Sequence, residues 1–214
     1  MLKAVLFDLD GTFADTAPDL ARAINVMRES RALPPLPSEV TRPVTSLGGR
    51  GMLRVGFDMS PDHAQYAAMR EEFLELYAKN LCLETRVFPG VSELVARLQE
   101  RGIKWGIVTN KAERFAKPLM HLLGFAEHCA CVIGGDTTSR TKPHPDPLLA
   151  ACQVLGIEAC HCAYVGDDSR DIDAGRAAGM KTIAVRYGYL NGGVPDTWGA
   201  DAVVDCPEDV LHHV

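Results

Sequence analysis

The sequence predicts an α/β protein: a Rossmann-like, three-layer core on a parallel sheet, with an inserted helical cap domain. Six short apolar runs rich in Val and Ile alternate along the chain with helical stretches. That alternation is typical of a parallel sheet covered by helices on both faces. About ninety residues separate the first run from the second, whereas a simple crossover between parallel strands needs about a dozen. The inserted domain is expected in that interval.

The composition is that of an ordinary globular protein. The chain has 214 residues, of which 47% are hydrophobic and 23% charged, and its net charge is −6. A non-specific nucleic-acid binder needs a broad basic surface, which this balance does not favour. No apolar run approaches the roughly 18 residues that span a bilayer. We therefore expect neither a nucleic-acid partner nor a membrane partner.

The seven cysteines predict reduced thiols. Their number is odd, and the chain is large enough to form a core without disulfides. We expect a cytoplasmic protein that is a monomer or a homodimer. Cys160-His161-Cys162 is the cluster that most resembles a metal site, but it lacks the spaced second ligand pair of a tetrahedral zinc site, and Cys129-x-Cys131 does not have the usual two-residue spacing. Zinc is therefore not expected.

The core elements follow in order along the chain. Strands are expected at Ala4–Phe7, Lys104–Val108, Cys131–Ile133, Ala163–Val165, Thr182–Val185 and Ala202–Val204. Helices are expected at Ser92–Arg101, Lys111–Leu123, Pro147–Leu155 and Asp171–Ala178. A glycine follows each of these helices, at positions 102, 124, 156 and 179. Glycine there predicts a left-handed residue that ends the helix.

The insertion carries its own helix signals. Thr16-x-x-Asp19 resembles a capping box at the start of an amphipathic helix. The proline-rich segment Leu33–Pro37 predicts a stiff connection. Ser60-Pro61 is expected to open a further helix that runs to about Leu81.

The ends of the insertion set the expected domain boundaries. Residues 16–84 are expected to form the helical cap, and residues 1–15 with 85–214 the core. Hinges are expected near Ala14–Thr16 and Leu83–Phe88. Closure of the cap about these hinges would exclude water from a site between the two domains.

The end of the first strand is a candidate site. Asp8 and Asp10 lie two residues apart, so in extended backbone they share one face. Gly11 follows and would allow the backbone to approach a ligand closely. Ligands collect at the carboxyl ends of strands in open parallel sheets. An ordinary Asp-Gly turn at the strand end explains the same residues equally well.

Polar groups also follow three later strands. They are Thr109 and Asn110 after the second strand, Lys142 after the third, and Asp167, Asp168 and Asp171 after the fourth. Taken singly, each has a structural explanation, as a helix N-cap, a solvated lysine or acids at a helix start. Taken together, they form an acidic centre with one lysine and one hydroxyl. Such a centre suits a hard divalent cation and a phosphate group.

These motifs resemble those of the haloacid dehalogenase superfamily of phosphohydrolases. The resemblance rests on Asp8-x-Asp10-Gly11-Thr12, Thr109, Lys142 and Gly166-Asp167-x-x-x-Asp171, in this order, with a helical insertion after the first. It covers essentially the whole chain. The opening segment, Lys142-Pro143 and Tyr187-Gly188-Tyr189 also resemble the phosphoglycolate phosphatase branch, and Phe13 departs from it where Leu is usual.

The resemblance implies a phosphatase with four catalytic residues. Asp8 is implied as the nucleophile that forms an aspartyl-phosphate, and Asp10 as the general acid and then the base. Thr109 is implied to bind the phosphoryl oxygens, and Lys142 to neutralise the nucleophile and the phosphoryl group. Gly11 and Asn110 are implied as substrate-binding residues beside them.

The resemblance also implies Mg²⁺ as the cofactor. Asp8, the backbone carbonyl of Asp10 and Asp167 are implied as its ligands, with water and a phosphoryl oxygen completing the shell. Asp171 is implied as an outer ligand or as the residue that orients metal-bound water. Asp168 belongs either to the metal site or only to the start of the following helix.

The substrate is expected to be a small phosphorylated metabolite, chosen by the cap. The best candidate there is Arg50 in Leu47-Gly48-Gly49-Arg50-Gly51, which could bind a carboxylate or a sugar oxygen; a solvated arginine explains it equally well. 2-Phosphoglycolate is the first expectation by resemblance. N-acetylmuramic acid 6-phosphate or another phosphosugar is the alternative, because Ser46–Arg50 and Trp198–Ala202 resemble that phosphatase group.

Other functions remain open on the sequence alone. A sugar phosphomutase would share all the motifs but would need a cap that excludes water. A true dehalogenase would not need the Asp10 and Asp167 arrangement. A receiver-like module would be shorter and lack a cap. A non-catalytic phosphate-binding protein would be expected to have lost Asp8, Asp10 or Lys142, all of which are present.

Overall fold

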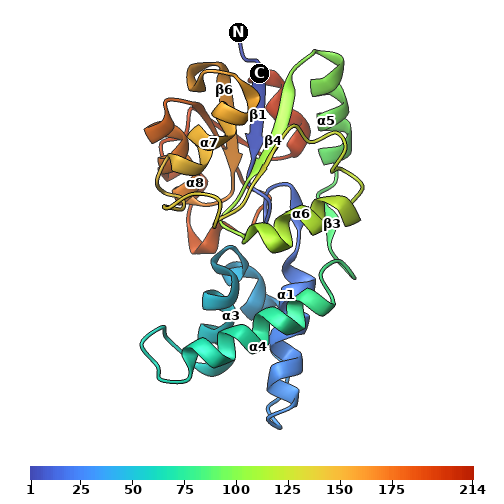
Figure 1. The fold of residues 1–214 in the computed structure, drawn as a ribbon, viewed down its shortest axis with the longest axis vertical. Coiled ribbons are helices and arrows are strands. Elements are labelled where there is room, and N and C mark those ends of the chain that lie inside the picture. Colours follow the sequence, from blue (N-terminus) through green and yellow to red (C-terminus); the bar gives the residue numbers. More distant parts are fainter.

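A computed structural model describes all 214 residues. Its sheet has six strands in the order β5-β4-β1-β6-β7-β8, and every neighbouring pair is parallel. The strands are β1 (Ala4–Phe7), β4 (Lys104–Val108), β5 (Val132–Ile133), β6 (Cys162–Gly166), β7 (Lys181–Val185) and β8 (Ala202–Val204). Strand β1 lies between β4 and β6 near the middle of the sheet (Figure 1). The residues that follow β1 therefore lie near the middle of the edge formed by the carboxyl ends of the strands.

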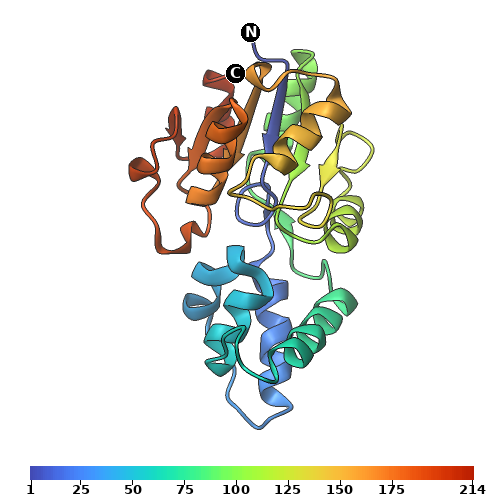
Figure 2. The same cartoon turned by 60° about the vertical axis from the view of Figure 1, so that its left-hand side comes forward.

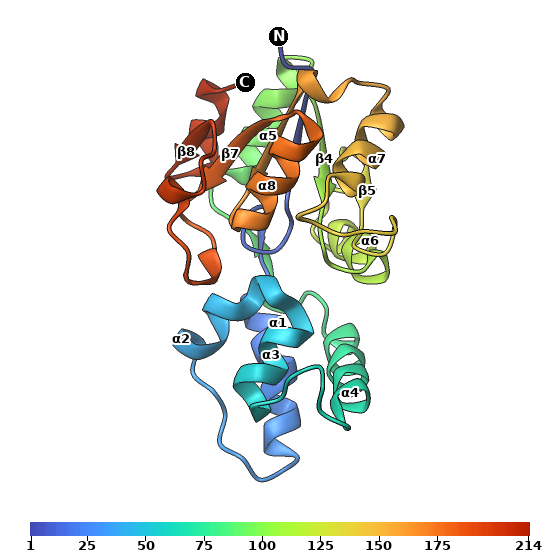
Figure 3. The same cartoon turned by 90° about the vertical axis from the view of Figure 1, so that its left-hand side faces the viewer.

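Helices cover both faces of this sheet. They are α5 (Val91–Glu100), α6 (Glu113–Leu122), α7 (Asp146–Leu155) and α8 (Ser169–Ala178). On β1, Val5 and Phe7 pack into one apolar cluster with α5 and α6, while Ala4 and Leu6 pack into another with α7 and α8. This alternation follows from the two-residue period of a strand. Helices α7 and α8 lie in front of the sheet in Figure 3 and α5 lies behind it, so the predicted three-layer α/β core is confirmed.

The predicted helix ends agree with the structure to within two residues. All four glycines have the positive φ that favours glycine: Gly102 (70°), Gly124 (82°), Gly156 (66°) and Gly179 (77°). Gly156 and Gly179 are the C-cap residues of α7 and α8. The repeated helix-to-glycine pattern therefore marks real helix ends.

A separate group of helices lies beyond the carboxyl ends of the strands (Figures 1 and 2). It contains α1 (Ala17–Glu29), α2 (Ser38–Thr41), the 3₁₀ helix Arg42–Leu47, α3 (Gly48–Phe57) and α4 (Tyr66–Lys79). The expected start of α4 at Ser60-Pro61 is wrong, because residues 61–65 form turns and a bend and the helix begins at Tyr66. No helix of the protein combines the length and the apolarity that crossing a membrane requires.

Two short strands join this group to the sheet. Strand β2 (Ala14–Asp15) pairs antiparallel with β3 (Arg86–Val87). These segments are the two that the sequence marks as hinges. Because they hydrogen-bond to each other, the two chain crossings form one two-stranded connection.

The predicted Thr16-x-x-Asp19 capping box is wrong. Thr16 is the N-cap residue of α1, but its side chain makes no cap hydrogen bond. The hydroxyl of Tyr189, remote in sequence, instead accepts hydrogen bonds from the backbone N–H groups of Thr16 (2.7 Å) and Ala17 (2.9 Å). The Asp19 carboxylate accepts from the backbone N–H and hydroxyl of Thr85. The local capping rule fails because long-range partners satisfy these groups.

We expect Tyr189→Phe to lower stability by about 1–3 kcal/mol, because it leaves two buried N–H groups without an acceptor. The hydroxyl also donates to Asp15 Oδ1 at 2.9 Å, and that contact is lost as well. Thermal unfolding should show a midpoint lower by roughly 2–12 °C. Tyr66→Phe is the matched control, since no hydrogen bond involves its hydroxyl. An equal shift in both variants would contradict the capping role.

Candidate active site

Three carboxylates meet at the carboxyl ends of β1 and β6. Asp8, Asp167 and Asp171 are 7%, 0% and 1% exposed, and their oxygen atoms lie within 4.8 Å of one another. Parallel pairing of β1 with β6 places the residues that follow each strand side by side. The sequence prediction that the first and fourth strands contribute to one acidic site is therefore correct in geometry.

Lys142 lies against this cluster. Its Nζ atom is 2.9 Å from Asp8 Oδ1 and 2.6 Å from Asp171 Oδ1, and it donates a hydrogen bond to the Tyr164 hydroxyl at 2.7 Å. Burial alone would lower the pKa of Lys142, but the negative charges of Asp171 and Asp8 outweigh it and raise the pKa. The lysine is therefore a fixed positive charge between two of the three carboxylates.

Three ionised carboxylates in this cluster would carry more negative charge than one lysine balances. Burial, together with the charges of Asp8 and Asp171, raises the pKa of Asp167 well above its usual range. Burial also raises the pKa of Asp171 to about 6, against the lowering effect of Lys142. Asp8 Oδ1 is buried and makes no hydrogen bond of good direction, despite its short distance to the lysine. Clustered carboxylate oxygen atoms whose negative charge is not fully balanced are suitable ligands for a divalent cation.

Asp167 is enclosed by residues that follow β1 and β7. The Thr12 hydroxyl donates to its Oδ1 at 2.9 Å, and the Tyr189 backbone N–H donates to its Oδ2 at 2.9 Å. A side chain at Gly11, whose φ is +92°, or at Gly188 would collide with this carboxylate. Gly11 does not line the cavity described below, and its N–H already donates to Ala14. Its structural effect is to make room for Asp167.

Asp10 lines the same cavity but is not part of the three-carboxylate cluster. Its carboxylate accepts hydrogen bonds from the Thr16 hydroxyl at 2.5 Å and from Lys111 Nζ at 2.9 Å. The Lys111 ammonium also lies 4.7 Å from the centre of the Tyr77 ring on α4. Burial would lower the pKa of Lys111, but the Asp10 charge raises it. The Asp10 carboxylate is therefore held by Thr16 and Lys111, and the role of its backbone carbonyl as a metal ligand stays a prediction.

Lys111 is a site residue that the sequence analysis missed. The available signal was its position directly after Thr109-Asn110 at the end of β4. Thr109 is 2% exposed, and its hydroxyl accepts from the Lys111 backbone N–H at 3.2 Å. The Asn110 side chain bonds to both backbone groups of Lys142, at 3.0 Å each. Asn110 thus fixes the loop that carries the lysine.

A cavity of about 240 Å³ lies between the sheet and the helical group. Among the residues predicted for the site, those lining it are Asp8, Asp10, Arg50, Thr109, Asn110, Lys142 and Asp171, whereas Gly11 and Asp167 do not. Helices α3 and α4 supply the opposite wall with several further side chains. The site therefore has a floor of acidic and basic side chains and a separate helical wall.

The helical group contacts the acidic floor directly. The Ser46 hydroxyl donates to Asp167 Oδ2 at 3.3 Å, and Arg170 donates to the Ser46 carbonyl at 3.1 Å. Arg170 also pairs with Asp168 at 2.8 Å. Asp168 and Asp171 together form a capping box at the start of α8. Asp168 is thereby occupied by the helix start and by Arg170.

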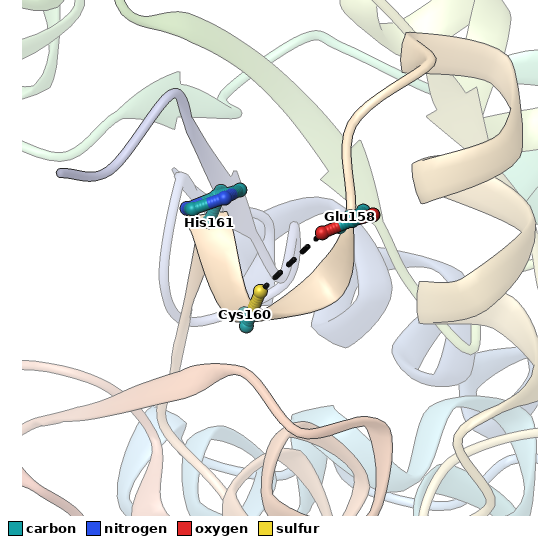
Figure 4. Close-up of side chains that lie close together, drawn as sticks. All are labelled: Glu158, Cys160 and His161. Carbon is teal, nitrogen blue, oxygen red and sulfur yellow. Dashed lines mark hydrogen bonds between the residues drawn. The ribbon is translucent and has the colours of Figure 1, made fainter.

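A second group of metal-ligand types lies at the other end of β6. Glu158, Cys160 and His161 come together on the turn before that strand, with the carboxylate and the thiol exposed (Figure 4). Cys162, which follows in sequence, is buried beside Cys152 instead. The expected cysteine and histidine cluster therefore contributes two of its three residues to this turn. It is separated from the acidic floor by the length of the strand.

Comparison with known proteins agrees with this geometry. The family model for haloacid dehalogenase-like hydrolases matches residues 5–185. An N-acetylmuramic acid 6-phosphate phosphatase from Pseudomonas aeruginosa is 44% identical over 211 residues, covering 98% of this chain and 93% of that protein. A phosphoglycolate phosphatase from Xanthomonas campestris pv. campestris is 46% identical over 206 residues, covering 96% and 93%. A crystal structure from Haemophilus somnus, described as a predicted phosphoglycolate phosphatase, superposes with a TM-score of 0.88 at 26% identity, covering 99% and 97%.

Proposed function

The chain belongs to the haloacid dehalogenase-like hydrolases and is a phosphatase, and from this premise we propose that Asp8 is its nucleophile. The observation that carries the proposal is the position of Asp8 at the cavity floor, 2.9 Å from the Lys142 ammonium and within the three-carboxylate cluster. An ionised carboxylate held beside a cation is ready to attack an electrophilic phosphorus.

The proposed reaction has two displacements. In the first, an Asp8 oxygen forms a bond to phosphorus as the ester P–O bond breaks. Asp10, which must enter this step as the carboxylic acid, gives its proton to the departing alkoxide and becomes the carboxylate that pairs with Lys111 in this structure. In the second, Asp10 takes a proton from water, the water oxygen attacks phosphorus, and inorganic phosphate leaves Asp8. Thr109 and Lys142 stabilise the charge on the phosphoryl oxygens in both steps.

We propose Mg²⁺ as the divalent cation. Asp8, Asp167 and the backbone carbonyl of Asp10 would hold it, with Asp171 in the outer shell. When bound, the cation supplies positive charge to the phosphoryl oxygens and to the buried carboxylates. The rise in the pKa of Asp167 that its neighbours cause is the electrostatic observation that favours such a cation.

We also propose that residues 16–84 are a mobile cap over a core of residues 1–15 and 85–214. The β2 and β3 connection lies at both boundaries. Because Ser46 and Arg170 join the cap to the floor, the structure has the contacts expected of a closed cap. Opening would admit substrate, and closure would exclude water from the cavity.

The proposed substrate is a small phosphorylated metabolite. 2-Phosphoglycolate and N-acetylmuramic acid 6-phosphate are the two candidates, since they are the compounds named for the two relatives above. We propose a monomer or a homodimer. The seven free thiols suit the reducing cytoplasm.

The test is phosphate release from a panel of phosphate esters with and without Mg²⁺. Both candidate substrates and p-nitrophenyl phosphate belong in the panel. We expect release that stops when a chelator removes the divalent cation and returns when Mg²⁺ is restored. Absence of release from every compound in the presence of Mg²⁺ would refute the proposed function.

Asp167→Asn should raise the Mg²⁺ concentration for half-maximal activity at least about tenfold, because a charged ligand becomes neutral. A titration of activity against Mg²⁺ measures this shift. Asp168→Asn is the matched neighbour: asparagine still caps a helix, and we expect the Mg²⁺ requirement to stay the same. Equal shifts in the two variants would show that Asp167 has no special part in cation binding.

A further inference from the structure

Most of the positive charges that line the cavity are already neutralised. Six basic side chains line it: Arg50, Arg70, Lys111, Arg114, Lys142 and Arg170. Four of them have carboxylate partners, respectively Asp10 for Lys111, Glu71 for Arg114, Asp8 and Asp171 for Lys142, and Asp168 for Arg170. Arg50 and Arg70 form no ion pair and no hydrogen bond with any protein group. Both side chains are exposed, so the rim of the cavity has two guanidinium charges that no carboxylate of the protein neutralises.

These two arginines lie on adjoining helices of the cap. Arg50 belongs to α3 and Arg70 to α4. Gly49, next to Arg50, approaches α4 so closely that a side chain there would touch Phe73 at 3.2 Å and Arg70 at 3.8 Å. The two helices are therefore packed closely where they carry these arginines, and both arginines line the same cavity.

Helix α4 presents a graded stripe to the cavity. Arg70, Phe73, Leu74 and Tyr77 all line it and follow the three- and four-residue spacing of one helix face. The stripe runs from a cation through apolar side chains to a phenol over about 10 Å, given the rise of a helix. Its phenol end adjoins Lys111, which holds Asp10. The apolar middle suits a carbon skeleton.

The hydroxyl of Tyr77 is a third group at the cavity without a hydrogen-bond partner in the protein. Tyr77 is 1% exposed, and its oxygen makes no hydrogen bond of ordinary geometry. Burial raises its pKa to about 12, although the nearby Lys111 ammonium acts in the opposite direction. A buried hydroxyl without a partner costs free energy unless a ligand satisfies it. Tyr77 therefore indicates a polar group on the alcohol portion of the phosphate ester, which departs in the first displacement.

We propose that Arg50 and Arg70 form an anion subsite, and that Tyr77 binds a hydroxyl or ether oxygen between this subsite and the phosphate. The favoured substrate class is a phosphate ester of an acidic sugar or polyol, with its carboxylate several atoms from the ester oxygen. Glycolate has two carbons and a single carboxylate beyond the ester oxygen, so it cannot occupy the Tyr77 position and the arginine subsite together. This inference rests on the proposed phosphatase function and names its substrate class.

A matched substrate pair tests the anion subsite. N-acetylmuramic acid 6-phosphate and N-acetylglucosamine 6-phosphate share a phosphorylated sugar, but only the first carries a lactyl carboxylate. We expect kcat/KM to favour the acidic sugar about tenfold or more, which corresponds to charged hydrogen bonds at a partly exposed site. It should also exceed kcat/KM for 2-phosphoglycolate. Equal values for the two sugars, or a preference for 2-phosphoglycolate, would overturn the proposal.

Variants locate the preference. Arg70→Gln and Arg50→Gln should each reduce the ratio of kcat/KM between the two sugars, mainly through KM for the acidic one. Arg54→Gln is the control, because Arg54 is an exposed arginine of α3 that does not line the cavity. An unchanged ratio in both subsite variants would refute their role. Mg²⁺-dependent release from p-nitrophenyl phosphate without a sugar preference would refute the subsite while leaving the phosphatase proposal intact.

Discussion

Asp8→Asn should reduce phosphate release by at least about 10⁴-fold, because an amide oxygen cannot form the aspartyl-phosphate. The side chain keeps its size, and the carboxylate that it replaces is one of three crowded into a buried cluster. We therefore expect the fold to persist, with a thermal midpoint at or near that of the unmodified protein. Phosphate release and thermal unfolding measured on the same sample separate the two effects.

Asp173→Asn supplies the control for this variant. Asp173 is an exposed acid on α8, two positions beyond Asp171, so the same chemical change falls outside the cavity. It should leave turnover unaffected. Near-normal turnover by Asp8→Asn would remove Asp8 as the nucleophile, whatever the behaviour of the control.

Lys142→Met should damage both activity and stability. The ammonium lies between Asp8 and Asp171, with both ion pairs buried, and removal of one partner from a buried pair costs about 3–5 kcal/mol. Loss of the charge that stabilises the phosphoryl group should lower kcat by a further factor of roughly 10²–10³. Chemical denaturation and steady-state kinetics measure the two losses.

A second variant separates charge from fold in this case. Lys142→Arg keeps a positive charge at the same depth but changes its shape and number of donors. We expect it to recover much of the stability and little of the activity, since the ammonium also fits between the Tyr164 hydroxyl and the Val108 carbonyl. If Lys142→Met retained both stability and kcat, the lysine would have no electrostatic role at the floor.

The parts of the site that follow strands were predictable from the sequence. In a parallel sheet the residues after each strand share one edge, so Asp8, Thr109 and Asp167 could be placed together from three apolar runs alone. The helix ends were predictable for a similar reason, because a glycine with positive φ is a local requirement. These features depend on short segments of sequence, so a local pattern is enough to predict them.

The supports of the site were not predictable in this way. Tyr189 contacts Thr16 across 173 positions of sequence, and Lys111 meets Asp10 across 101. Thr16 and Asp19 fit a local capping rule, yet each binds a partner elsewhere in the structure. Local patterns omit such contacts because they arise only when loops from different strands pack together.

If residues 16–84 move as the proposed cap, the hydrogen bond from Ser46 to Asp167 couples that movement to the charge state of a floor carboxylate. Thermodynamic reciprocity then applies. Ionisation of the carboxylate and closure of the cap favour each other, and each changes the equilibrium constant of the other by the same factor. Cation affinity measured on the protein alone would thus be lower than cation affinity in the presence of a substrate that holds the cap shut. Cation binding and substrate binding form one thermodynamic cycle, so the dissociation constant of each ligand depends on whether the other is bound.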